Sequence, residues 1–261
     1  EVKTRGAFVM AVTNEGNIDI EKAADYVALD LETTGLNPRE DMIIEIGAVK
    51  FIGGSRMENF SSFVNPGIHI PPRITEITGI DDNMVSSAPA IDKVLKELLD
   101  FIGELPVLGH NVAFDYGFVC QKALNLKMKY QAMCIDTHKI SRKLLSGLES
   151  RSLENLCNFY GIVEEPRHRA FSDAAAAASL YDRMYEEALS RDNEDYGALF
   201  LPENIAYTAK KDSPATSRQI SFLKSLIRQH GVVLDKELES LTKSQASREI
   251  DKILSTYGRD F

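Results

Sequence analysis

The chain has 261 residues, of which 44% are hydrophobic, and a formal net charge of −9. This length allows one large domain with a small appendage, and the apolar content is sufficient for a buried core. The negative charge argues against a protein that simply coats nucleic acid, because such affinity comes mainly from Lys and Arg. It does not exclude an enzyme that acts on nucleic acid, since metal-binding acids also count as negative charges.

The first 22 residues form an N-terminal extension with one short apolar segment, residues 7–12. This segment is too short to span a bilayer and lacks the layout of a signal peptide. Three cysteines with no paired metal-ligand spacing fit a reducing compartment. We therefore expect a cytoplasmic protein without membrane contact. The extension is either a hairpin added to a sheet edge or the remnant of a longer upstream region.

Residues 26–35 have the sequence YVALDLETTG, an apolar strand that brings Asp30 and Glu32 to its far end before a break at Thr33 and Thr34. Residues two apart in a strand point to the same face, so the two carboxylates should lie side by side. Like charges repel, and a hard divalent cation with oxygen ligands would hold such a pair together.

The rest of the first 190 residues predicts alternating element types. Two further strands at 42–52 and 57–64 follow through short connections, as in an antiparallel meander. A helical pattern then covers 90–102. Beyond it, strands at 106–109 and 132–136 are each followed by a helix, at 113–126 and 138–145. Two more helices follow at 153–160 and 173–189. This order predicts an α/β domain over residues 23–190, with a mixed five-stranded sheet flanked by helices.

Residues 191–213 are polar and predict a linker. Beyond it, capping-box patterns that start at Thr216 and Thr242 each precede a helical repeat of apolar residues. We expect a small helical accessory module over 214–258. Its size is near the lower limit for independent folding, which favours docking on the main domain or on a partner.

Two more acids lie where elements begin. Asp115 falls in the first turns of a helix that follows a strand, and Asp173 begins the alanine-rich helix five residues after His168. Either acid alone could simply cap a turn or favour a helix dipole. Together with Asp30 and Glu32 they indicate a metal site, because the ends of strands and helices are where α/β proteins build sites.

Three segments resemble, in order, the exonuclease motifs of the DEDDh 3′-5′ exonucleases: ALDLETTGL, LGHNVAFD and HRAFSDA. That group includes the proofreading epsilon subunit of bacterial DNA polymerase III and the exonuclease domain of polymerase C. The resemblance covers residues 24–190. It implies a ribonuclease H-like fold and hydrolysis of phosphodiester bonds from the 3′ end, with release of 5′-mononucleotides.

The resemblance also implies roles for individual residues. Asp30, Glu32, Asp115 and Asp173 would hold two Mg²⁺ or Mn²⁺ ions, which fits the preference of these ions for oxygen ligands. His168 would be the general base, since a neutral histidine accepts a proton near neutral pH.

Several neighbours of these acids are candidate substrate contacts. Thr33, Thr34 and Leu36 occupy positions where the family meets the terminal nucleotide. His110 and Asn111 could touch substrate or merely satisfy a tight turn, and Phe114 could stack on a base or belong to the core. Glu45, inside an apolar strand, either faces solvent or supports the site.

We expect a partner of the nucleic-acid class, namely a single-stranded or frayed DNA 3′ end. Two alternatives stay open: an exoribonuclease that trims RNA ends, and a non-catalytic adaptor with the same fold. No polymerase motif is present, so a proofreading role would need a polymerase or another replication or repair partner.

Overall fold

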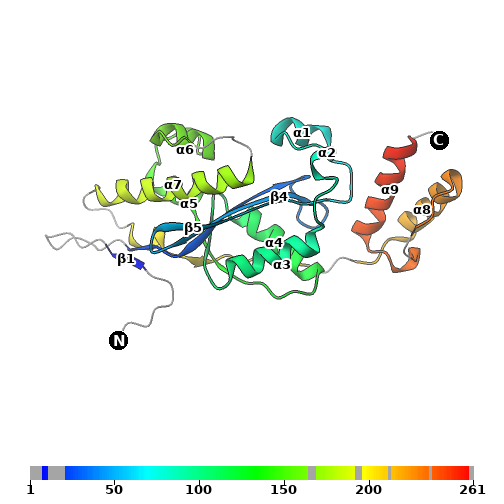
Figure 1. Ribbon diagram of the computed structural model, residues 1–261, viewed down its shortest axis with the longest axis horizontal. Helices are drawn as coiled ribbons and strands as arrows, with labels where there is room; N and C mark the ends of the chain where they lie inside the picture. Colours follow the sequence, from blue (N-terminus) through cyan, green and yellow to red (C-terminus); the bar gives the residue numbers. More distant parts are fainter. Residues whose placement is uncertain are drawn as a thin grey trace.

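The computed structural model describes residues 8–10, 21–163, 169–191, 196–210, 213–234 and 237–258. At its centre lies a six-stranded sheet in the order β5-β4-β3-β6-β7-β8. Figure 1 shows β4 and β5 of this sheet between helices. The strands are β3 (Tyr26–Thr33), β4 (Ile43–Ile52), β5 (Ser55–Phe63), β6 (Val107–Gly109), β7 (Met133–Asp136) and β8 (Glu203–Asn204). β5, β4 and β3 form the predicted antiparallel meander, whereas β6 and β7 run parallel to β3. The mixed sheet is therefore confirmed, and the two-residue β8 adds a sixth strand to the five predicted.

Helices cover both faces of the sheet (Figure 1). On one face lie α3 (Ile91–Ile102) and α4 (Ala113–Asn125), and on the other α5 (Thr137–Leu144), α6 (Leu153–Tyr160) and α7 (Ala170–Leu189). β3 shows the two-residue period directly. Val27, Leu29 and Leu31 are buried with α3 and α4, whereas Tyr26 and Ala28 are buried with α7. By the same alternation Asp30 and Glu32 belong to the α7 face.

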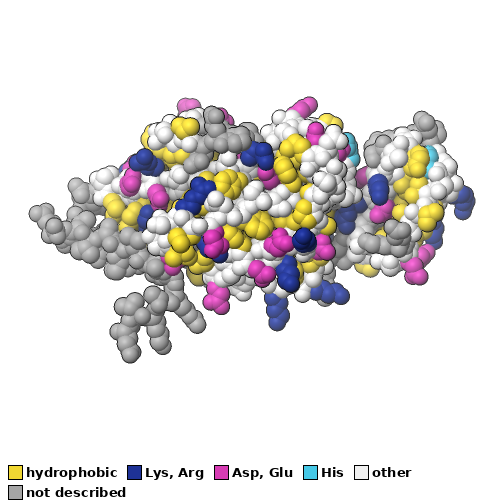
Figure 2. Space-filling model, in the orientation of Figure 1, with side chains coloured by type: hydrophobic (Ala, Val, Ile, Leu, Met, Phe, Trp, Pro, Cys, Tyr) yellow, Lys and Arg dark blue, Asp and Glu magenta, His cyan; other side chains and the backbone are white. Residues whose placement is uncertain are grey.

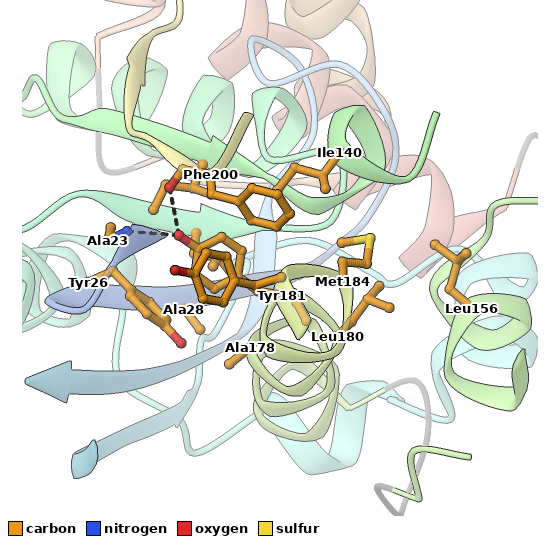
Figure 3. Packing of buried hydrophobic residues seen from close by; sticks show 14 of the residues in the cluster. Ala23, Tyr26, Ala28, Ile140, Leu156, Ala178, Leu180, Tyr181, Met184 and Phe200 are labelled. Carbon is orange, nitrogen blue, oxygen red and sulfur yellow. Dashed lines mark hydrogen bonds between the residues drawn. The ribbon is translucent and has the colours of Figure 1, made fainter. Parts of the chain in front are cut away.

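The α7 face is fixed by an aromatic cluster (Figure 3). The Tyr181 hydroxyl accepts a hydrogen bond from the Ala23 backbone N–H at 3.0 Å and donates one to the Phe200 carbonyl at 2.7 Å. Tyr26 lies edge-on to Tyr181, with ring centroids 5.5 Å apart. One buried hydroxyl thus connects α7, the strand β2 (Glu21–Ala23) and the 3₁₀ helix η1 (Gly197–Phe200).

The expected linker over 191–213 is not a linker in the part that the structure describes. Tyr196 and Phe200 are fully buried in the α7 cluster, and Glu203–Asn204 pair with β7. Tyr207 lies over Gly117 of α4, where an added Cβ would come within 3.2 Å of the tyrosine ring. The few aromatic residues in this polar stretch decide its location, because each buries a large apolar area.

Two short helices, α1 (Pro72–Thr78) and α2 (Asp82–Val85), lie in a stretch for which the sequence predicted no element. At the N-terminus, β1 (Phe8–Met10) pairs antiparallel with β2. This pairing favours the hairpin of the two interpretations, although the pair forms a two-stranded sheet of its own.

The C-terminal residues form two helices, α8 (Ser217–His230) and α9 (Lys243–Tyr257), with the short η2 (Leu238–Ser240) between them. Both predicted capping boxes are present, and α8 ends at Gly231 in the left-handed region with φ 65°. The helices share a separate apolar core that includes Leu223, Leu226 and Ile250. We call residues 213–258 the module. Among the described helices, none is long and apolar enough to cross a membrane.

Candidate active site

Three carboxylates converge beyond the middle of β3. Asp30, Glu32 and Asp173 each offer an oxygen atom, and these atoms lie within 4.8 Å of one another. β3 supplies two of them through its alternation, and α7 supplies the third from its first turn. The register of β3 against β4 shifts between Glu32 and Thr33, so the strand becomes irregular just after its second acid.

Gly47 of β4 allows α7 to begin close to this pair of acids. It lies opposite Asp30 in the sheet, and a Cβ at this position would be 2.0 Å from the backbone nitrogen of Phe171. No side chain fits there, so the first turn of α7 rests directly on the strand. Asp173 follows two residues later.

An ion pair holds the same helix start. Glu45 is 2% exposed, and its carboxylate accepts two hydrogen bonds from Arg169 Nε and Nη2 through Oε1, at 3.0 and 2.8 Å. It also accepts the Ala170 backbone N–H at 3.2 Å. Of the two interpretations of Glu45, the structure therefore favours the supporting role. The sequence did not indicate that Gly47 or Arg169 would position α7.

Asp115 joins the site from the other side. Its Oδ1 accepts the backbone N–H of Leu31 at 3.0 Å, between the two acids of β3. β6 pairs with β3 only at Val27 and Ala28, which leaves the Leu31 N–H available to this side chain. Asp115 is outside the 4.8 Å group but lines the same cavity, so the structure brings all four predicted acids to one place.

The four acids line a cavity of about 330 Å³. His110, Asn111 and Phe114, whose contact with substrate stays a prediction, also line it, together with Glu154, which no pattern in the sequence had indicated. Thr33, Thr34 and Leu36 do not line this cavity: the two threonines are buried, and Leu36 is 84% exposed. The Thr33 hydroxyl donates to the Gly35 carbonyl, and the Thr34 hydroxyl accepts the Met42 N–H.

The turn between β6 and α4 is held by hydrogen bonds. His110 has Nδ1 2.9 Å from the Thr137 hydroxyl and Nε2 2.9 Å from the Arg151 carbonyl, and burial lowers its pKa. Asn111 has φ 65°, a value uncommon for residues other than glycine, and its N–H donates to Asp136 at 3.0 Å. His110 is thus held by backbone and hydroxyl partners, which favours the turn interpretation for its ring.

Burial and mutual repulsion disfavour the charged forms of these acids. The pKa of Asp30 is raised well above its usual range, first by burial and then by Asp115 and Asp173. The pKa of Glu32 is raised to about 7 by burial, Asp173 and Glu45, while Arg169 opposes the rise. Burial likewise raises the pKa of Asp115. Clustered oxygen donors with too little compensating charge fit a hard divalent cation such as Mg²⁺ or Mn²⁺.

His168 lies outside the described residues, so its predicted role as a base stays a prediction.

Known proteins are similar to the part of the chain that carries this site. A family model described as "Exonuclease" matches residues 27–181. The DNA polymerase III PolC-type of Clostridium perfringens is 39% identical over 167 residues, which is 62% of this chain and 12% of that protein. The DNA polymerase III subunit epsilon of Aquifex aeolicus is 35% identical over 163 residues, 62% of this chain and 81% of the subunit. The chain thus spans about an eighth of the PolC-type relatives.

Solved structures share the fold. Exonuclease X, in complex with 5′ overhanging duplex DNA, superimposes with a TM-score of 0.52 at 24% identity, covering 67% of this chain and all but 1% of that chain. Exonuclease I superimposes with a TM-score of 0.56 at 18% identity, covering 64% of this chain and 43% of that chain. The residues 27–181 that match the family model include all four acids of the cavity. Because this match covers more than half of the chain, the chain belongs to the exonuclease family.

Proposed function

We propose that this protein is a metal-dependent 3′-5′ exonuclease that shortens single-stranded or frayed DNA ends and releases 5′-mononucleotides. The observation that carries the proposal is the convergence of Asp30, Glu32 and Asp173 within 4.8 Å, beside Asp115 in the same cavity. The family match, and the overhanging duplex DNA with which Exonuclease X forms its complex, support a nucleic-acid substrate.

The four acids would hold two Mg²⁺ or Mn²⁺ ions. When bound, two such ions offset the negative charge of the phosphodiester and of the oxygens that attack and leave it. His168, five residues before Asp173, would accept the proton of the attacking water. Asp115 has a second task in this scheme, because its bond to the Leu31 N–H fixes the backbone between Asp30 and Glu32.

The terminal nucleotide would lie in the 330 Å³ cavity, with Phe114 as a stacking surface and Asn111 as a polar contact. Thr33, Thr34 and Leu36 lie outside the lining of this cavity, so they would meet the nucleotide only at its edge, where β3 ends. The relatives from DNA polymerase III support a replication or repair partner, with action in the cytoplasm.

The decisive experiment compares wild type with Asp30→Asn on a 5′-labelled oligonucleotide in Mn²⁺. We expect stepwise shortening from the 3′ end by wild type and a loss of at least a hundredfold in the variant, since one carboxylate charge is removed from the cluster. A 3′-phosphorothioate oligonucleotide controls for direction. Activity that survives Asp30→Asn contradicts the proposal.

His168→Gln separates the base from the metal ligands. We expect turnover to fall while Mn²⁺ binding by calorimetry stays near the wild-type value. Equal losses of both would place His168 among the ligands. Matched DNA and RNA oligomers, run side by side, distinguish the exodeoxyribonuclease from the exoribonuclease alternative, and absence of metal binding would support a non-catalytic adaptor.

A further inference from the structure

A second cavity lies between the main domain and the module. It has a volume of about 660 Å³, and we call it the module groove. One wall comes from the β3–β4 loop and from Ile68, His69 and Pro71. The opposite wall is built mostly from α9, with Lys243, Arg248 and Lys252 among its lining residues. Figure 2 shows the boundary as a notch, with Lys and Arg side chains on the module and at the junction.

The groove begins where the metal-binding strand ends. Thr34 lines it and lies two residues after Glu32, which lines the first cavity. Direct contacts place α9 against this loop: the Ser244 hydroxyl donates to the Arg39 carbonyl at 3.2 Å, and Arg248 Nη1 lies 3.9 Å from Met42 Sδ. The linings of the two cavities therefore come within two residues of each other along the chain.

The charge of the module differs from that of the rest of the chain. Residues 213–258 hold seven Lys and Arg against five Asp and Glu, a net charge of +2 in a protein of −9. Lys243, Arg248 and Lys252 span ten residues of α9, or about 13.5 Å along its axis. A point anion needs one such group, whereas three cations that line one groove suit a chain of phosphates.

Three acids also line the groove. Glu40 and Asp41 belong to the facing loop and Asp251 to α9. Asp41 is engaged in folding that loop, because its Oδ2 accepts the Asn37 N–H at 2.7 Å. The negative charge therefore lies largely on the loop wall, opposite the cations of α9.

Two cations, Lys122 and Arg248, approach each other at Met42. Lys122 Nζ lies 4.0 Å from Met42 Sδ, the same sulfur that Arg248 contacts. Burial and the nearby Arg248 lower the pKa of Lys122 to about 8. An anion held by Arg248 would relieve the repulsion between these two groups.

Building on the proposed function, we infer that the module groove binds the phosphate backbone of the nucleic-acid strand upstream of the 3′-terminal nucleotide. Lys243, Arg248 and Lys252 would contact successive phosphates without reading sequence. The module would then lengthen the binding site beyond the catalytic cavity and favour long strands over short ones.

The test uses the full chain with Lys243→Glu and Lys252→Glu combined. Both side chains are exposed, so the fold should survive, and a Lys→Gln pair provides a milder version. The matched control is Lys224→Glu with Arg228→Glu, two exposed cations of α8 outside the groove with the same change in charge. Each protein is assayed on a dT16 oligonucleotide and on the p-nitrophenyl ester of thymidine 5′-monophosphate, which is too small to reach the groove. Binding of labelled dT16 is measured separately by anisotropy in EDTA.

We expect the groove variant to bind dT16 at least tenfold more weakly, while hydrolysis of the small ester is unchanged. The slope of log K against log salt concentration should become shallower by about 1.4, from two phosphate contacts at ~0.7 each. Equal weakening in the control variant, or unchanged binding in the groove variant, overturns the inference, and the second result would leave the groove to a protein partner. If wild type hydrolyses neither substrate, the proposed function fails. The anisotropy measurement still tests whether the module groove binds dT16, because it does not depend on hydrolysis.

Discussion

Asp136 lies outside the carboxylate cluster but helps to position one of its members, Asp115. Its Oδ1 caps α5 by accepting the N–H groups of His138 and Lys139, and it also accepts the N–H of Asn111. Asn111 has a left-handed backbone conformation that costs free energy unless its surroundings hold it. One acceptor oxygen therefore stabilises the turn from which α4, and with it Asp115, begins.

We predict that Asp136→Ala lowers kcat on an oligonucleotide about tenfold or more, whereas Asp136→Asn, which keeps an acceptor oxygen, stays close to wild type. For each variant, kcat and the thermal unfolding midpoint are both measured. Loss of the cap itself should cost about 0.5–2 kcal/mol. Asp81→Ala is the control, because Asp81 caps α2 through the Met84 N–H. A fall in kcat no larger than in Asp81→Ala would show that Asp136 only stabilises the fold.

The acids of the site also predict how stability depends on pH. The pKa of Glu32 is about 7 in the folded chain against an ordinary 4.5, so between these values the folded state binds a proton that the unfolded state has lost. Stability therefore falls as pH rises from about 4.5 to 7, by about 3 kcal/mol for this group. The raised pKa values of Asp30 and Asp115 act in the same direction.

Thermal unfolding in EDTA should consequently give a lower midpoint at pH 8 than at pH 5, and added Mn²⁺ should raise the midpoint more at pH 8. Glu32→Gln should weaken this dependence, whereas Glu97→Gln, at an exposed position of α3, should not. A midpoint in EDTA that rises between pH 5 and pH 8 would contradict the assignment of these acids as a strained cluster.

At the scale of elements, the contact between β4 and α7 decides where Asp173 lies. Gly47→Ala would place a Cβ 2.0 Å from the Phe171 nitrogen and 2.1 Å from the Ala170 carbonyl carbon. These are backbone atoms, so α7 must move. We expect a stability loss at or above the 1–3 kcal/mol typical of overpacking, together with loss of nuclease activity.

Gly147→Ala is the matched control, since a Cβ there meets nothing within 4 Å. Unfolding by denaturant and the oligonucleotide assay measure both effects. Wild-type stability and activity in Gly47→Ala would mean that the helix start tolerates displacement and that Asp173 is not placed by this contact.

The sequence predicted the elements whose local signals agree with their packing. Both capping boxes of the module, the strand β3 and the helix α3 follow directly from capping residues and hydrophobic period. The four acids were predicted as a set because each lies at the end or start of an element. The support that Gly47, Glu45 and Asp136 give depends on pairing register and on tertiary contacts, which no local pattern contains. For the same reason the sequence did not predict that the hydroxyls of Thr33 and Thr34 take part in hydrogen bonds within the protein.

At the scale of the whole molecule, the structure places the domain boundary later than the sequence does. Tyr196 and Phe200 are buried against Tyr181 and Tyr185, with the rings of Phe200 and Tyr185 5.3 Å apart. The module, by contrast, has a core of its own. A chain that ends at residue 210 should thus keep the main domain intact, and a chain that ends at residue 190 should not.

We predict that the fragment ending at 210 melts within a few degrees of the full chain, whereas the fragment ending at 190 aggregates or melts far lower. Phe200→Ala in the full chain gives the same test without truncation and should cost about 3–5 kcal/mol, the usual loss for a buried phenylalanine. The variant Phe222→Ala, in the half-buried edge of the module core, should leave the melting of the main domain unchanged. Equal stability of the two fragments would restore residues 191–213 as a linker. A strong loss in both would mean instead that the main domain depends on its contact with α9, the contact that also forms the module groove.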